Sequence, residues 1–303
     1  MNRTSARVHV FVGKGGVGKT TCAAATGLHH SDLGFATLAL STDPTPSLSH
    51  IFGEHGPQRS LRVSPRLTIS ELGIPEVKQM WDAKFGREVY AVFSTFVDVE
   101  YPVFIAFMTS LLPGLREEFT IDYIRELATA RTYDRIVWDT APLGQTLALL
   151  QMPALLAEHL RLAPRVYSRF RGTANRKSVL EILEGWSELA EICTAFLREQ
   201  TSFSLVTIPE ALAVEQLDSV WTELGTHGFE VDRVIINNVV RAPDSPFLRE
   251  KAANQAPYLR RLHERFARID VVELPLFPHE IRGNQTLREV AAVLQHADQK
   301  VNA

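Results

Sequence analysis

The sequence has few cysteines, and their scarcity excludes several classes of protein. Its 303 residues include only two cysteines, too few within one chain for a four-cysteine zinc site or an iron–sulfur cluster. The two are Cys22 and Cys193, which are too far apart in sequence to form a CxxC pair. The disulfide framework of a small secreted domain is also lacking, and this suits a reducing compartment. We therefore expect a cytoplasmic protein.

A strong charge imbalance and long apolar runs are also missing. The formal net charge of −3 gives no overall basic field, so we expect no nucleic-acid partner. The residues before the glycine-rich loop contain no apolar core of signal-peptide length. No stretch reaches the roughly 18 apolar residues of a membrane-spanning helix. The nearest one, Pro102 to Leu115, is shorter and contains two prolines.

Short apolar, β-branched runs alternate with longer segments of helical period, a pattern typical of an α/β fold with a mostly parallel, doubly wound sheet. The predicted strands are Val8–Val12, Ala36–Ser41, Arg135–Asp139, Phe203–Ile208, Arg233–Asn237 and Val271–Leu274. Two segments, from about 75 to 130 and from about 150 to 200, have helical period without a convincing strand. We predict one domain over residues 1–303, with these two segments forming an inserted helical subdomain.

A glycine-rich loop is the strongest motif. Residues 13–20, Gly-Lys-Gly-Gly-Val-Gly-Lys-Thr, match the phosphate-binding pattern G-x-x-x-x-G-K-[ST] between a predicted strand and a predicted helix. Backbone N–H groups of such a loop and the helix N-terminus attract phosphate, Lys19 would bind the β and γ phosphates of ATP, and Thr20 would bind Mg²⁺. The alternative is a glycine-rich turn without a ligand, which the complete motif disfavours. The predicted nucleotide-binding residues here are Gly13, Gly15, Gly16, Val17, Gly18, Lys19, Thr20 and Thr21.

Two predicted strands end in aspartates, at the edge of the sheet where ligands gather in α/β folds. Asp43 follows the second strand, where a carboxylate can orient an attacking water molecule. Asp139 closes the third strand, as does the carboxylate near Mg²⁺ in phosphate-loop enzymes. Gly144 would let the next loop move when the γ-phosphate leaves. Either aspartate alone is equally typical of a helix N-cap, but two of them after a phosphate loop favour a nucleotide site.

A second lysine, Lys14, follows the first glycine of the loop. The string KGGVGKTT resembles the deviant Walker A class of ATPases, which includes MinD, ParA, the nitrogenase iron protein and ArsA. The resemblance implies a face-to-face homodimer in which Lys14 reaches the partner's nucleotide and acts like an arginine finger. A solvated loop lysine is the alternative. The predicted catalytic residues are Lys14, Lys19 and Asp43, the predicted cofactors are ATP and Mg²⁺, and the predicted metal ligands are Thr20 and Asp139.

Several further motifs resemble the ArsA family, which comprises ATPase subunits of arsenite pumps and ATPases that deliver tail-anchored membrane proteins. Their order matches the family along nearly the whole chain: STDPTPSLSHIFG (41–53), LLPGLREE (111–118), DTAPLGQTLALLQMP (139–153), VTIPEALAVEQ (206–216), VIINNVV (234–240) and PLFPHEIRG (275–283). The resemblance implies that Asp43 positions the hydrolytic water. It also implies that Asn237 and the loop containing Pro278 lie at the adenine.

The chain departs from the family pattern at several positions. Pro46 and Gln145 replace usual histidines of the two switch segments, and His50 replaces a usual aspartate. The paired CxxC of the targeting factors and the clustered cysteines of the pump ATPases are absent. We therefore expect Cys22 and Cys193 to be small core residues rather than metalloid ligands.

The predicted helices suggest what the ATPase acts on. Aromatic and methionine side chains between residues 80 and 112 suit a groove for an apolar helix, although they would equally fill the subdomain's own core. A basic run from Arg161 to Lys177 would dock an acidic partner or lipid headgroups, or be a solvated face. The favoured hypothesis is a homodimeric targeting factor for hydrophobic membrane-protein segments that also meets a membrane receptor. The alternatives are the ATPase subunit of an arsenite or antimonite pump and a ParA- or MinD-like positioning ATPase.

Overall fold

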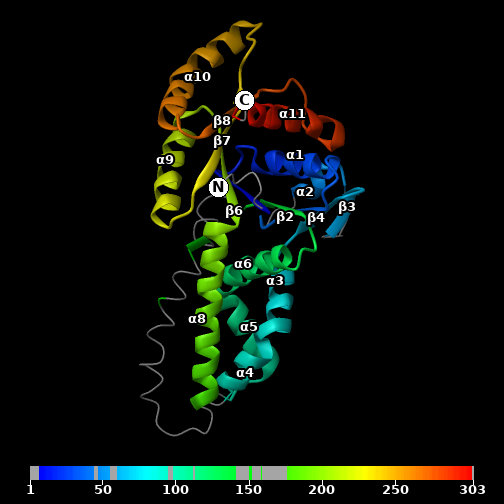
Figure 1. The fold of residues 1–303 in the computed structure, drawn as a ribbon, viewed down its shortest axis with the longest axis vertical. Helices are drawn as coiled ribbons and strands as arrows, with labels where there is room; N and C mark the ends of the chain where they lie inside the picture. The colour runs from blue at the N-terminus through cyan, green and yellow to red at the C-terminus, as the bar shows by residue number, and fades with distance from the viewer. Residues whose placement is uncertain are drawn as a thin grey trace. The chain divides into compact units, whose positions relative to one another are not determined.

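The chain divides into two compact units in the computed structural model, which describes residues 7–43, 47–54, 60–94, 98–111, 113–140, 150–151, 158 and 176–301 (Figure 1). The first unit comprises residues 1–72, 130–146 and 200–303, and the second comprises residues 73–129 and 147–199. Among the described residues, no helix is both long and apolar enough to cross a membrane.

The first unit contains an eight-stranded sheet in the order β3-β4-β2-β5-β1-β6-β7-β8. The strands are β1 (Val8–Gly13), β2 (Thr37–Ser41), β3 (Ser60–Ser64), β4 (Leu67–Glu71), β5 (Arg135–Asp139), β6 (Thr201–Thr207), β7 (Val231–Val239) and β8 (Asp270–Pro275). All neighbouring pairs are parallel except β3 with β4, which is antiparallel. The predicted α/β fold with a mostly parallel sheet is therefore confirmed, and the six predicted strands are all present.

Two strands, β3 and β4, were not predicted. They form an antiparallel pair at one end of the sheet, joined by a turn at Pro65 and Arg66. β3 is exposed or only half-buried along its length, so it lacks the continuous apolar run that marks the buried parallel strands. β4 does alternate, with Leu67 and Ile69 buried, which is the ordinary pattern of a strand with one buried face.

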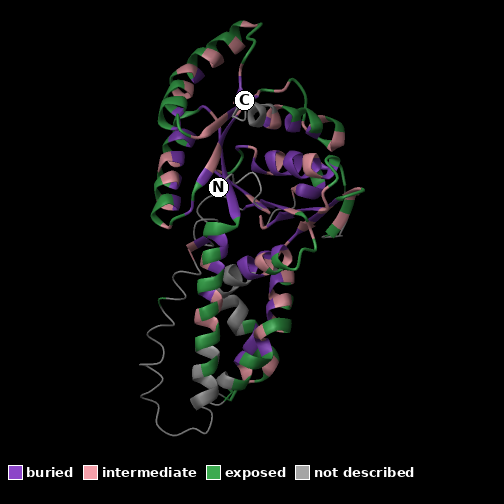
Figure 2. Cartoon of the chain, in the orientation of Figure 1, coloured by how far each residue is buried: buried purple, intermediate pink, exposed green. Residues whose placement is uncertain are grey.

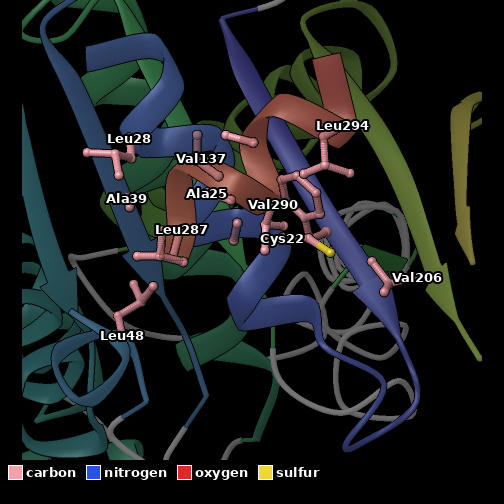
Figure 3. Close-up of a cluster of buried hydrophobic side chains, with 14 of the residues drawn as sticks. Cys22, Ala25, Leu28, Ala39, Leu48, Val137, Val206, Leu287, Val290 and Leu294 are labelled. Atoms are coloured by element: carbon pink, nitrogen blue, oxygen red, sulfur yellow. The ribbon is translucent and has the colours of Figure 1, made fainter. Parts of the chain in front are cut away.

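Helices cover the sheet of the first unit. They are α1 (Lys19–Asp32), α2 (Leu48–Ile51), α9 (Ala211–Thr226), α10 (Pro246–Arg265) and α11 (Gly283–Val301). α1 and α11 pack against each other, and Figure 2 shows the buried residues concentrated in the strands and in α1. Figure 3 shows one core cluster that joins both helices to the sheet. It includes Cys22, Leu28, Val137, Val206, Leu287 and Leu294. Each fully buried leucine contributes roughly 1.5–3 kcal/mol to folding.

The second unit is helical where it is described. Its elements are α3 (Ile74–Trp81), a π-helical turn η2 (Asp82–Gly86), α4 (Arg87–Phe93), α5 (Tyr101–Leu111), α6 (Pro113–Thr129) and α8 (Arg176–Glu199). The fully buried carboxylate of Asp122 is paired with Lys84 and with Arg125, whose Nε lies 3.0 Å from Asp122 Oδ1. Two cations offset the cost of burying this charge, and the pairing ties η2 to α6.

A group of histidines lies between α1 and the sheet. The ring of His30 lies 5.2 Å from that of His9, centroid to centroid. Both ring nitrogens of His30 are buried and accept or donate no hydrogen bond among the described residues. The pKa of His30 is lowered to about 3, chiefly by burial and further by His9, His29 and Arg135. His30 is therefore neutral in the folded protein.

This neutral histidine predicts a loss of stability in mild acid. In the unfolded chain, His30 binds a proton below the ordinary histidine pKa of about 6.5. In the folded protein it stays unprotonated until the pH falls to about 3. The free energy of unfolding should therefore fall as the pH drops from 6.5, by up to roughly 1.4 kcal/mol per pH unit from this one proton. Urea unfolding of the wild type and His30→Leu between pH 7 and 5 checks this. The variant should show the shallower pH dependence, and identical slopes would contradict the assignment.

Candidate nucleotide-binding site

The glycine-rich loop lies between β1 and α1, and its glycines occupy positions that other residues would strain. Gly16 and Gly18 have φ angles of 79° and 101°, in the left-handed region that favours glycine. A Cβ at Gly13 would clash with the carbonyl oxygen of Val206 on β6, so glycine allows the two strands to approach. Gly15 is exposed at the loop, whereas Val17 is buried in the core cluster. At Gly15 and Gly16 the loop backbone is therefore exposed, with no side chain of its own to cover it.

Lys19 is held against the loop. Its Nζ donates a hydrogen bond to the carbonyl oxygen of Lys14 at 3.1 Å, and the residue is only 6% exposed. Burial lowers the pKa of Lys19, while the nearby carboxylates of Asp139 and Asp43 oppose this shift. A largely buried ammonium group next to open loop backbone is suited to binding a polyanion.

Asp139 occupies the carboxyl end of β5 and is 1% exposed. Its Oδ2 accepts hydrogen bonds from Thr20 Oγ1 at 2.9 Å and from Ser41 Oγ at 3.2 Å. Ser41 is the register partner of Asp139 on the neighbouring strand β2. Burial raises the pKa of Asp139 to about 6, against the opposing effects of Thr20, Lys19 and Ser41. The carboxylate is therefore placed where it costs energy to keep it ionised without a cation.

The oxygen atoms around Asp139 fit a magnesium ion. Asp139 Oδ1 is buried and makes no hydrogen bond with any residue in the described part of the chain. Thr20 Oγ1 lies 3.4 Å from Ser47 Oγ as well as beside Asp139. Hydroxyl and carboxylate oxygens are the ligands that Mg²⁺ takes in phosphate-loop sites, where phosphates and water complete its octahedron. Thr20 and Asp139 are thus the residues that would hold the metal.

The segment predicted as the first switch is tied to the sheet on both sides of residues 44–46, which lie outside the described residues. The backbone N–H of Asp43 donates to Ser41 Oγ at 3.2 Å. Beyond the gap, Glu71 at the end of β4 accepts from the backbone N–H and the hydroxyl of Ser49, at 3.2 and 3.0 Å. Sequence reasoning missed Glu71, and it assigned no separate role to Ser41 and Ser47 within the first switch motif. The alternation along β4, which ends in a charged residue, is the signal that points to Glu71.

Asn237, which was predicted to lie at the adenine, is close to the phosphate loop. Asn237 on β7 donates from Nδ2 to the carbonyl oxygen of Val17 at 2.9 Å, so the structure brings it to the phosphate loop. Pro278 lies in the loop that follows β8, and Thr21 and Lys14 are half-buried in α1 and in the loop. The second switch from residue 141 to 149, with Gly144 and Gln145, lies outside the described residues, as does Pro46.

The two cysteines occupy the core of separate units. Cys22 and Cys193 are both fully buried, which confirms the prediction that they are core residues. Burial, together with Asp139, raises the pKa of the Cys22 thiol to about 12.

The site combines a glycine loop between a strand and a helix with a buried lysine and with a threonine that is hydrogen-bonded to the aspartate of a neighbouring strand. These features define a P-loop nucleoside triphosphatase. The family of anion-transporting ATPases has a model that matches residues 6–296, and the chain belongs to this family. The chain is accordingly an ATPase.

Relatives of this chain carry two kinds of name. An arsenical pump-driving ATPase homologue of Aquifex aeolicus is 29% identical over 95% of this chain and 99% of its own length. A homologue of Chlorobaculum tepidum with the same kind of name is 28% identical over 94% of this chain and 74% of its own length. ATPase GET3A of Arabidopsis thaliana is 29% identical over 92% of this chain and 81% of its own length.

Proposed function

We propose that the protein is a homodimeric nucleotide switch that delivers hydrophobic segments of membrane proteins. ATP and Mg²⁺ bind at residues 13–20, Asp43 orients the attacking water, and Lys14 acts on the partner's nucleotide. The observation that carries the proposal is the contact of Thr20 with Asp139 beside Lys19. A candidate metal ligand and a buried cation lie together in this cluster, which supports the binding of a γ-phosphate here. Release of that phosphate would change the forces on both switch segments.

The helical unit supports the second half of the proposal. α5 is rich in apolar residues, and within its described part Phe104 and Ile105 are buried while Val103 is 55% exposed. On α8, Ile192 is 50% exposed. Apolar side chains left in water on helices are suited to hold an apolar client helix. The groove was also predicted to include residues 107–112, Phe96 and Val97. The structure does not describe their side chains.

A client-capture experiment tests this function. A labelled peptide with a single hydrophobic tail helix is offered to the purified protein with Mg²⁺ and either ATP or ADP. We expect a stable complex with ATP and a weaker one with ADP, while an amphipathic helix of equal length fails to bind. A complex that forms equally with both nucleotides, or with neither, would remove the targeting proposal and leave the ATPase intact.

A pair of matched variants assigns the client surface to the helical unit. Val103→Asp should reduce peptide capture several-fold without changing ATP turnover, because it places a charge on an apolar surface. Leu212 on α9 has the same exposed fraction as Val103, 55%, but belongs to the first unit. Leu212→Asp should therefore leave capture unchanged. Equal effects of the two substitutions would show that the surface is not on the helical unit.

The pump ATPase is the second candidate, because several relatives carry that name. Trivalent arsenic and antimony bind thiolates, yet both cysteines are fully buried and the pKa of Cys22 is about 12. We therefore expect antimonite to leave the ATPase rate of the wild type unchanged. A Cys22→Ala, Cys193→Ala double variant serves as the reference in a steady-state phosphate-release assay. Stimulation of the wild type that the double variant loses would favour the pump.

A further inference from the structure

One buried amide outside the glycine loop closes the end of β7. Gln255 lies on α10 and is 3% exposed. Its Nε2 donates to the carbonyl oxygen of Asn238, and its Oε1 accepts from the backbone N–H of Val240, each at 2.9 Å. One side chain thus pairs with both backbone groups that flank Val239, much as another strand would.

The backbone that Gln255 holds is irregular. Asn238 has a φ angle of 61°, in the left-handed region, and is not a glycine. The register between β7 and β8 shifts between Ile236 and Val239. Asparagine enters this region more readily than other non-glycine residues, yet the conformation is still sparsely populated and persists where its surroundings fix it. The two hydrogen bonds of Gln255 supply that constraint.

This irregular end of β7 joins the two elements proposed to meet the adenine. Asn237 immediately precedes Asn238, and its Nδ2 reaches the carbonyl oxygen of Val17. On the other side, the backbone N–H of Leu276 donates to the carbonyl oxygen of Val239 at 2.9 Å. Leu276 begins the loop that contains Pro278. A change in the backbone of residues 238–240 would therefore displace the Asn237 side chain and the Pro278 loop together.

We propose that Gln255 is a positioning residue for nucleotide recognition, acting through the backbone of residues 238–240 on Asn237 and the Pro278 loop. This inference rests on the proposed contact of those two elements with the adenine. Gln255 never touches the nucleotide; it fixes the direction in which Asn237 points. Its loss weakens the selection of the base and leaves the phosphate chemistry at Lys19 and Asp139 intact.

The test is Gln255→Met, which keeps the length of the side chain and removes both hydrogen-bonding groups. Gln255 borders a cavity of about 460 Å³, so the replacement can be accommodated. We expect the KM for ATP to rise about tenfold, the effect of one or two lost hydrogen bonds, with kcat unchanged. The preference for ATP over GTP, measured as the ratio of their dissociation constants, should fall by a similar factor. Asn254→Leu, an exposed amide one residue earlier, is the matched control and should change neither value.

A double-mutant cycle separates positioning from general destabilisation. The combination of Asn237→Ala with Gln255→Met should lose less selection for ATP than the sum of the two single losses, because Gln255 acts in part through Asn237. Gln255→Glu keeps the acceptor for Val240 but sets a buried carboxylate oxygen against the carbonyl oxygen of Asn238, so it should lose at least as much base selection as Gln255→Met. It also provides the result should the methionine variant not fold.

The outcomes separate the positioning role of Gln255 from the adenine contact of Asn237 on which it rests. If Asn237→Ala weakens base selection and both Gln255 variants leave it at the wild-type value, the positioning role is wrong and the adenine site stands. If Asn237→Ala itself leaves the ATP-to-GTP ratio unchanged, the adenine assignment and the role of Gln255 are both overturned. Additive effects in the double variant would also contradict the positioning role.

Discussion

Replacing Asp43 with asparagine is expected to lower ATP turnover by roughly 10²- to 10⁴-fold while ATP remains bound, the usual effect of losing a group that takes or orients a proton. Asp43 follows β2, its backbone N–H donates to Ser41 Oγ, and its charge acts on Lys19. Asparagine keeps the size of the side chain and most of its hydrogen bonding. The measurement pairs steady-state phosphate release with the dissociation constant for ATP.

A matched control keeps the Asp43 result specific. Asp98 is an exposed carboxylate in the helical unit, so Asp98→Asn makes the same chemical change outside the unit that contains the phosphate loop. It should turn over ATP at the wild-type rate. Full turnover by Asp43→Asn would contradict the water-orienting role. Loss of ATP binding would show instead that Asp43 contributes to the affinity for ATP before hydrolysis.

Replacing Lys14 with alanine is expected to lower ATP turnover by roughly 10³-fold. This is the lower end of the rate enhancement that an arginine finger gives when it stabilises the charge on the transferring phosphoryl group. Lys14 is half-buried in the loop, and its carbonyl oxygen, rather than its ammonium group, is what Lys19 contacts. Its side chain is thus available for a role that Lys19 does not fill. ATP binding by each isolated chain should persist, because the loop backbone, Lys19 and Thr20 are retained.

A mixed dimer tests whether Lys14 acts on the partner's nucleotide. Lys14→Ala and Asp43→Asn chains are co-expressed with different tags, and the doubly tagged dimer is purified. In a two-fold symmetric dimer, the Lys14→Ala chain keeps its own Asp43 and receives Lys14 from its partner, so one site is complete. About half of the wild-type turnover should return, although each variant alone is inactive. A mixed dimer as inactive as its parents would show that Lys14 acts within its own chain.

Local motifs predicted much of the site, because the phosphate loop is encoded by contiguous residues. The glycines at 16 and 18 are required by backbone angles that the motif implies, and Lys19 and Thr20 follow them directly in α1. The buried parallel strands were equally predictable, since each is a short apolar run that ends at or next to a glycine, proline or polar residue. The sequence pattern therefore predicted the α/β fold and the residues that the structure brings together at the glycine-rich loop.

Contacts between distant segments could not be predicted in the same way. Ser41 meets Asp139 because β2 and β5 are neighbours in register, and 98 positions separate them in the chain. Gln255 reaches β7 across the turn into α10, and nothing in its local sequence marks it out among the polar residues of an amphipathic helix. β3 escaped prediction because an exposed strand at the end of the sheet carries little apolar pattern.

Calorimetric titration of the purified protein with ATP in the presence of Mg²⁺ tests most directly whether residues 13–20 hold a triphosphate. The wild type should bind ATP saturably at one site per chain. Lys19→Ala should bind at least about 100-fold more weakly, equivalent to about 2.7 kcal/mol, because it removes the buried cation beside Asp139. No binding heat from the wild type beyond dilution, or equally tight binding by Lys19→Ala, would contradict the account.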